Sequence, residues 1–146
     1  MYPRLNFINL AVDSLDRSLI FYRDGLGLQT QGIVGSEYYD EQTGAVGTIV
    51  FFELQGGLML GLYERSNLAK DAVIPLGSPS SAEFSLGYAV KTKREVDGVL
   101  ERAKHAGATV TDSVHERPWG VYSGYFKDPD SHLWEVTYDP RIAIDN

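Results

Sequence analysis

The most distinctive reactive side chain in the sequence is the carboxylate of Glu135, which stands in the largely apolar segment LWEV. A carboxylate in apolar surroundings is desolvated and can serve as a general base or as the partner of a cation. The three histidines are weaker candidates. His132 lies three residues before Glu135 and so points to the opposite face of a strand, His105 falls on a predicted helix, and His115 ends a strand in a charged segment. We expect surface or structural roles for all three.

Composition limits the classes of function. The chain has 146 residues, a net charge of −7 and no cysteine, which excludes disulfides, thiol nucleophiles and cysteine-held zinc. No basic cluster is present, which argues against nucleic acid as a partner, and the acidic balance mildly favours cationic ligands. No apolar run reaches the roughly 18 residues of a membrane span. The first residues lead directly into a predicted strand and leave no room for a signal peptide, so we expect a cytoplasmic protein.

The chain repeats one plan twice. Aligning residues 11–12 with 89–90 pairs Ser14 with Thr92, and both are candidate N-caps of helices. Thr92 and Glu95 form a T-x-x-E capping box, and Gly107 can adopt the left-handed conformation that ends a helix. Each predicted helix carries an apolar stripe typical of core packing. These stripes are Leu15, Leu19 and Tyr22, helped by Leu26, and Val96, Val99, Leu100 and Ala103.

Strand-like stretches precede and follow each predicted helix. In the first half they lie near residues 5–12, 28–35, 47–54 and 58–63, and in the second near 84–90, 109–115, 121–127 and 133–138. The order βαβββ, found twice, predicts an α+β protein with a curved mixed sheet and helices outside. We expect one domain over residues 1–146, with modules at 4–63 and 84–138 and a linker at 64–83, rich in serine, proline and alanine.

Two segments resemble a known family. Residues 9–13 (NLAVD) and 18–28 (SLIFYRDGLGL) are similar to its opening strand and its S-x-x-F-Y-x-x-x-L-G-L motif, and residues 124–135 (GYFKDPDSHLWE) to its G-Y-F-x-D-P-D-G-H-x-W-E ending. The family is the glyoxalase/bleomycin-resistance/dioxygenase, or vicinal oxygen chelate, superfamily. The resemblance implies a cup formed by the two modules. Ser131 departs from it, because the family usually has glycine there.

In the metal-using members, four side chains converge in this cup, one from the first and one from the last strand of each half. The corresponding positions here hold Phe7, about Gly61, Ser85 and Glu135, so only Glu135 matches. A catalytic divalent metal needs about three protein ligands, and we therefore expect no cofactor. One alternative stays open. A shift of two residues preserves the strand face, so Asn9 or Glu83 could join Glu135 in an oxygen-rich site for Mg or Mn.

Without a metal, the resemblance implies an apolar, aromatic-walled pocket for a small molecule. We expect Glu135 as the catalytic or cation-binding group. The expected substrate-binding residues are Phe7, Asn9, Met59, Gly61, Ser85, Trp119, Tyr122 and Leu133. For Trp119 and Tyr122, ordinary packing is an equal alternative, and Trp134 is expected in the core under a helix.

Two functions follow from the resemblance. One is a homodimeric binding protein, like the metal-free bleomycin-resistance members, that takes up a small organic ligand. The other is a glyoxalase-related lyase, isomerase or dioxygenase in which Glu135 acts as base or metal ligand.

Overall fold

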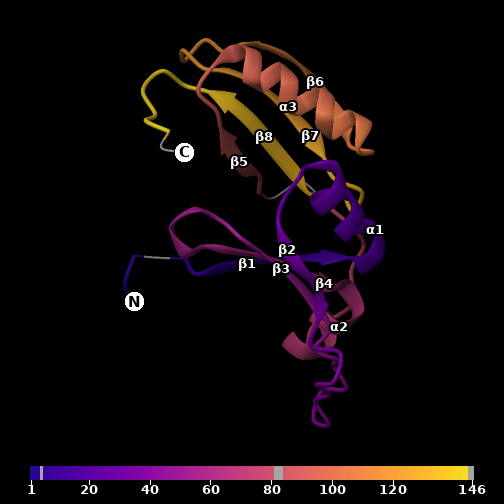
Figure 1. Cartoon of the computed structure of the whole chain (residues 1–146). Helices are drawn as coiled ribbons and strands as arrows, with labels where there is room; N and C mark the ends of the chain where they lie inside the picture. Colours follow the sequence, from indigo (N-terminus) through magenta and orange to yellow (C-terminus); the bar gives the residue numbers. More distant parts are fainter. Residues whose placement is uncertain (4, 81–83, 145–146) are drawn as a thin grey trace. The chain divides into compact units, whose positions relative to one another are not determined.

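The computed structural model describes residues 1–3, 5–80 and 84–144. The chain divides into two compact units, Met1–Ser78 and Pro79–Asn146. Each unit contains an open four-stranded mixed sheet with helical segments against it (Figure 1). The prediction of an α+β protein made of two tandem βαβββ modules is confirmed.

The first unit is built on the sheet order β1-β4-β3-β2, in which β1 and β4 are parallel and the other pairs are antiparallel. Its elements are β1 Phe7–Val12, α1 Leu15–Leu19, the π-helical turn Ile20–Gly25, β2 Thr30–Val34, β3 Ile49–Glu53, the 3-10 turn Gln55–Gly57, β4 Met59–Glu64 and α2 Arg65–Ala72. The helical segment 15–25 covers the sheet face that carries the buried side chains of Leu10, Phe52 and Leu60. We call the opposite face of this sheet, with Phe7, Asn9 and Gly61, the first open face.

The second unit repeats this arrangement in the order β5-β8-β7-β6, again with one parallel pair, β5 and β8. Its elements are β5 Leu86–Ala89, α3 Lys93–His105, β6 Thr109–Glu116, β7 Tyr122–Lys127 and β8 Leu133–Tyr138. The helix α3 lies across one face of this sheet (Figure 1), over the buried side chains of Phe126 and Val136. We call the opposite face, with Ser123, Tyr125 and Glu135, the second open face.

The predicted helix starts are confirmed. The Ser14 hydroxyl accepts a hydrogen bond from the backbone amide of Arg17 at 3.2 Å, and the Thr92 hydroxyl accepts one from that of Glu95, also at 3.2 Å. The Thr92 hydroxyl in turn donates to the Glu95 carboxylate at 3.1 Å, which completes the capping box through side chains. Gly107 follows α3 with a φ of 109°, as a helix stop requires.

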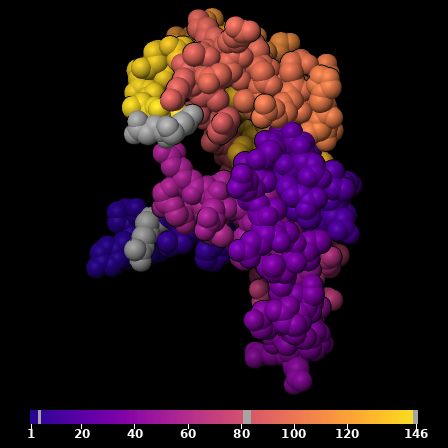
Figure 2. All heavy atoms as spheres, in the orientation of Figure 1, coloured from indigo at the N-terminus to yellow at the C-terminus, as the bar shows by residue number. Residues whose placement is uncertain are grey.

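The expected linker contains a helix. The residues RSNLAKDA form α2, which ends at Val73 in the left-handed conformation with a φ of 54°. Leucine, alanine, lysine and arginine favour a helix there, whereas serine and proline dominate only after residue 74. The side chain of Asn67 donates to Glu64 at 3.1 Å and accepts from the amide of Val46, also at 3.1 Å. It thereby anchors the β2–β3 connection, which forms the purple projection in Figure 2.

Candidate functional site

Glu135 lies near the middle of β8, half-buried on the second open face. Its neighbours in the sheet are Gly87 on β5 and Tyr125 on β7. Burial raises the pKa of the Tyr125 hydroxyl, and the charge of Glu135 and a hydrogen bond with it raise that pKa further, whereas the charge of Arg117 lowers it. The phenol therefore stays protonated and lies beside the Glu135 carboxylate as a hydrogen-bond donor.

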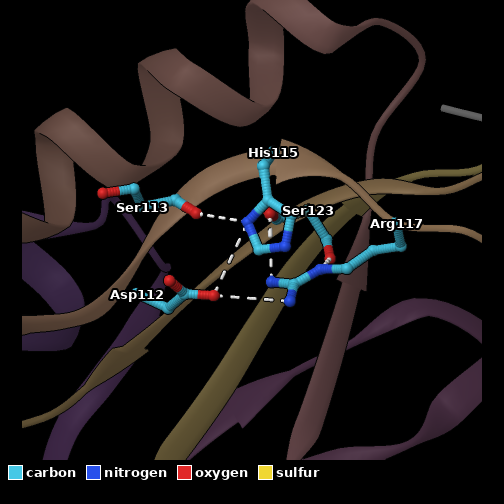
Figure 3. Close-up of polar contacts among 5 residues, drawn as sticks. All are labelled: Asp112, Ser113, His115, Arg117 and Ser123. Atoms are coloured by element: carbon cyan, nitrogen blue, oxygen red, sulfur yellow. Dashed lines mark hydrogen bonds and ion pairs between the residues drawn. The ribbon is translucent and has the colours of Figure 1, made fainter.

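Arg117 follows β6 and reaches the same face. Its guanidinium donates through Nε to the Ser123 hydroxyl at 3.0 Å and through Nη2 to the Ser123 carbonyl at 3.3 Å (Figure 3). Its Nη1 lies 3.3 Å from a carboxylate oxygen of Asp112, and its side chain is only 12% exposed. The guanidinium also lies over the Tyr125 ring, 5.5 Å from the ring centre. The guanidinium of Arg117 thus contacts three residues, Ser123, Asp112 and Tyr125.

An irregular strand brings these groups together. In β6 the register shifts on both sides of Asp112, so that Asp112 pairs with Tyr125 and His115 pairs with Ser123. Residues three apart normally point to opposite faces of a strand, and a bulge re-aims one of them. The ring Nδ1 of His115 lies 2.8 Å from the Ser113 carbonyl and 3.6 Å from Asp112 (Figure 3). We call Asp112, Arg117, Ser123, Tyr125 and Glu135 the β6–β8 cluster.

The charges of the β6–β8 cluster do not cancel. Arg117 and Asp112 form an ion pair, which leaves the charge of Glu135 uncompensated within the cluster. Lys127 lies two residues after Tyr125 on the same strand face, yet within the described part of the chain no ion pair joins it to Glu135. The site therefore presents one free carboxylate beside an aromatic ring, which suits a positively charged group or a hydrogen-bond donor.

Four predicted residues meet on the first open face. The register pairs Phe7 with Met59 and Asn9 with Gly61. The Asn9 carboxamide oxygen fills the space that a side chain at position 61 would need. This oxygen is buried and has no hydrogen-bond partner among the described residues. Phe7, by contrast, is 57% exposed. The first open face is thus mainly apolar with one unsatisfied acceptor.

A hollow of about 700 Å³ adjoins Met59 within the first unit. Besides Met59, it is lined by Gly27, Leu28, Gln29, Thr30, Gln31, Gly32, Val34, Phe51 and Glu53. Thr30 and Glu53 were not among the residues predicted from the sequence. For Glu53 the strand alternation with Phe51 was the available signal, because both share a face with Met59 and Gly61.

Tyr122 is not part of the β6–β8 cluster. It stands three residues before Tyr125, so strand alternation turns it toward α3, where its hydroxyl donates to Asp97 at 2.8 Å. That hydrogen bond and, less strongly, burial raise the pKa of Tyr122. Tyr122 therefore lies on the other face of the sheet from Glu135, and its expected place at the border of a ligand pocket stays a prediction.

The remaining predicted residues lie as follows. Leu133 shares the second open face with Glu135, Ser85 is exposed just before β5, and Trp119 is 63% exposed in the turn after Arg117. Trp134 stacks on the buried Phe126 ring with a centroid separation of 6.1 Å, which confirms its expected place under α3. Glu83 lies outside the described residues.

The histidines have structural or surface positions. His132 is buried, and its Nδ1 lies 2.5 Å from a carboxylate oxygen of Asp128 in the turn between β7 and β8. His105 is exposed at the end of α3 and bonds to the carbonyl of Glu101 at 2.8 Å. Neither lies beside Glu135 on the second open face, so neither could join Glu135 as a metal ligand.

The residues present do not fit the four-ligand metal site of the fold family. At the corresponding positions, Phe7 offers a phenyl ring, Gly61 no side chain and Ser85 a neutral hydroxyl. Among the described residues, no three His, Cys, Asp or Glu side chains converge as a metal site requires. Glu135 alone has the chemistry of a metal ligand at its position.

Comparisons with known proteins agree with this architecture. The chain matches the model of the Glyoxalase/Bleomycin resistance protein/Dioxygenase superfamily over residues 4–136. A glyoxalase-related enzyme from Fulvimarina pelagi is 24% identical with a TM-score of 0.80, covering 98% of this chain and 93% of that one. A lactoylglutathione lyase from Agrobacterium tumefaciens is 25% identical with a TM-score of 0.62, covering 93% of both chains.

The hypothetical protein SA1046 from S. aureus is also 25% identical, with a TM-score of 0.73 and coverage of 94% of this chain and 95% of that one. No curated protein shows significant similarity to the chain. None of the described helices has the length and apolar character that crossing a bilayer requires.

Proposed function

Because the chain belongs to the Glyoxalase/Bleomycin resistance protein/Dioxygenase superfamily, we propose that it binds a small organic molecule with a cationic group. The Glu135 carboxylate receives this group on the second open face. One observation carries the proposal: Glu135 is half-buried beside Tyr125, and among the described residues no cation pairs with it, since Arg117 is paired with Asp112. A partly desolvated carboxylate attracts a cation more strongly than an exposed one.

The test is a titration with cationic glycopeptides and aromatic amines. Binding stabilises the folded protein, so its melting temperature rises with ligand concentration, and the fluorescence of Trp119 and Trp134 reports the same event. Glu135→Gln should weaken binding about tenfold or more, since a hydrogen bond to a charged group contributes roughly 1.5–3 kcal/mol. Glu101→Gln, at an exposed position on α3, serves as the control and should bind like the parent. If no compound changes melting temperature or fluorescence, the proposal is wrong.

The proposal includes no metal, because the donor set described above does not fit one. Elemental analysis of protein purified without a histidine tag, after incubation with Mn, Ni, Zn and Fe, checks this point. We expect no bound metal. A near-stoichiometric divalent metal would show that other donors complete a site with Glu135.

A second candidate function is that of a glyoxalase-related enzyme with Glu135 as general base. The position of Tyr125 beside Glu135 in the sheet favours it, because a neighbouring phenol can orient the carboxylate, and proton transfer requires such positioning. The substrate would be a small oxygenated molecule with an acidic C–H bond. Turnover that persists unchanged in Glu135→Gln would exclude this role.

A further inference from the structure

The β6–β8 cluster contains its own cation, Arg117, which pairs with Asp112 and not with Glu135. We infer that Asp112 sets the charge preference of the site by holding Arg117, so that Glu135 stays available to a cationic ligand. This inference rests on the proposed function, in which Glu135 receives the ligand. It adds a specificity-determining residue that does not itself contact the ligand.

The contacts of Arg117 support this role. Its side chain is 12% exposed, its guanidinium donates hydrogen bonds to Ser123, and it forms an ion pair with Asp112. A guanidinium in such surroundings requires a negative partner, because an unpaired charge away from water is costly. Asp112 is that partner at 3.3 Å.

Tyr125 separates the two charges. Its ring lies under the Arg117 guanidinium, and the strand register places Tyr125 beside Glu135. The charge of Arg117 lowers the pKa of Tyr125 and that of Glu135 raises it, as expected for opposite charges near the phenol. If Asp112 loses its charge, Glu135 is the remaining carboxylate of the cluster, and Arg117 will turn toward it. The site then loses its free negative charge.

The register shifts of β6 make this arrangement possible. They place Asp112 opposite Tyr125 on the same face as Arg117, although the two residues are five apart and would lie on opposite faces of a regular strand. The register shifts of β6 therefore affect which ligand charge the site prefers, because they bring Asp112 close to Arg117. The lysine on this face, Lys127, does not reach Glu135 in the described structure.

Two substitutions should act in opposite directions. Asp112→Asn releases Arg117 to neutralise Glu135, so affinity for a cation falls and affinity for an anion of the same shape rises. Arg117→Gln removes the positive charge and leaves Asp112 and Glu135 both negative, so affinity for the cation rises. If Arg117 only supported the structure, both substitutions would weaken binding of both ligands.

The experiment uses benzylamine and benzoate as matched probes of opposite charge. The parent should prefer benzylamine. Asp112→Asn should reduce the ratio of the two affinities about tenfold, and Arg117→Gln should raise it several-fold, as expected for one charge at partial burial. Asp71→Asn, at an exposed position on α2, makes the same change in net charge and should leave the ratio unaltered.

The outcomes separate the two proposals. The role of Asp112 is overturned if Asp112→Asn keeps the parent's ratio of benzylamine to benzoate affinity while Glu135→Gln no longer prefers benzylamine. The proposed function then still stands. A parent that binds neither probe, or a Glu135→Gln variant that keeps the preference, overturns both. Circular dichroism and melting temperature identify a variant that fails to fold.

A second measurement needs no ligand. Ultraviolet difference titration follows tyrosine ionisation, and Tyr125→Phe identifies the transition that belongs to Tyr125. Because the charge of Glu135 raises the pKa of Tyr125 and that of Arg117 lowers it, the transition should move to lower pH in Glu135→Gln and to higher pH in Arg117→Gln. In Asp112→Asn it should move to lower pH, because Arg117 then neutralises Glu135. If the Tyr125 transition stays at the same pH in all three variants, the arrangement on which the inference depends is contradicted.

Discussion

At the scale of single residues, Ser131 adopts a conformation that suits glycine. It lies in the turn between β7 and β8 with a φ of 69°, and its amide donates to the Asp128 carbonyl at 3.0 Å. The left-handed conformation costs a residue with a side chain roughly 1–2 kcal/mol. Glycine avoids this cost, but it also makes the unfolded chain more flexible, which cancels part of the gain in stability. We predict that Ser131→Gly stabilises the protein by about 0.5–1 kcal/mol in chemical denaturation. A less stable variant would mean that the Ser131 side chain makes a contact that outweighs the strain.

The packing of Asn9 on Gly61 leads to a second prediction. A β-carbon at position 61 would collide with the Asn9 carboxamide oxygen, so Gly61→Ala should destabilise the protein by about 1–3 kcal/mol. In an Asn9→Ala background this collision is absent, and the same substitution should cost little. A double-mutant cycle measured by urea unfolding gives the coupling. Additive effects would show that the two residues do not meet.

Strand alternation predicts some site residues and misses others. It correctly separates Glu135 from Trp134, because β8 is regular. The same rule, applied to β7, would have turned Tyr122 away from Glu135. Asp112 and Arg117 could not be predicted, since the register shifts of β6 follow from its pairing with β7 and leave no mark in the local sequence.

At the scale of elements, two glycines of the second unit should respond oppositely to alanine. Gly98 lies on the exposed side of α3 with open space around it, so Gly98→Ala should stabilise by about 1 kcal/mol through helix propensity. Gly124 lies on β7 under the same helix, where a β-carbon would come within 2.6 Å of Leu100 Cδ1 and 3.1 Å of Val114 Cγ2.

Gly124→Ala should therefore destabilise by about 1–3 kcal/mol. Thermal unfolding of both variants is the measurement. A stabilised Gly124→Ala variant would contradict the close packing of α3 on β7.

Local signals in the sequence predicted most elements. Capping residues placed the starts of α1 and α3, and alternating apolar residues placed all eight strands within a few residues. The helix α2 was missed because its sequence has no capping residue: Glu64 precedes it without a side-chain hydrogen bond to its first amides. A tertiary contact joins it to the rest of the unit, since Asn67 accepts a hydrogen bond from the backbone amide of Val46.

At the scale of the whole molecule, we propose a homodimer, the assembly that the family resemblance implies and the commonest symmetric oligomer. Light scattering after size-exclusion chromatography should give twice the chain mass of 16.2 kDa. Because each chain carries a net charge of −7, repulsion should weaken the dimer at low ionic strength and added salt should strengthen it. A mass of one chain at every salt and protein concentration would contradict the proposal.

The central claim is that the uncompensated charge of Glu135 binds a cationic ligand. Isothermal titration of the parent with a cationic aromatic amine and with its neutral alcohol analogue tests it most directly. We predict at least a tenfold preference for the amine, which disappears in Glu135→Gln. Equal affinity of the parent for the amine and the alcohol would show that the charge of Glu135 does not take part in binding.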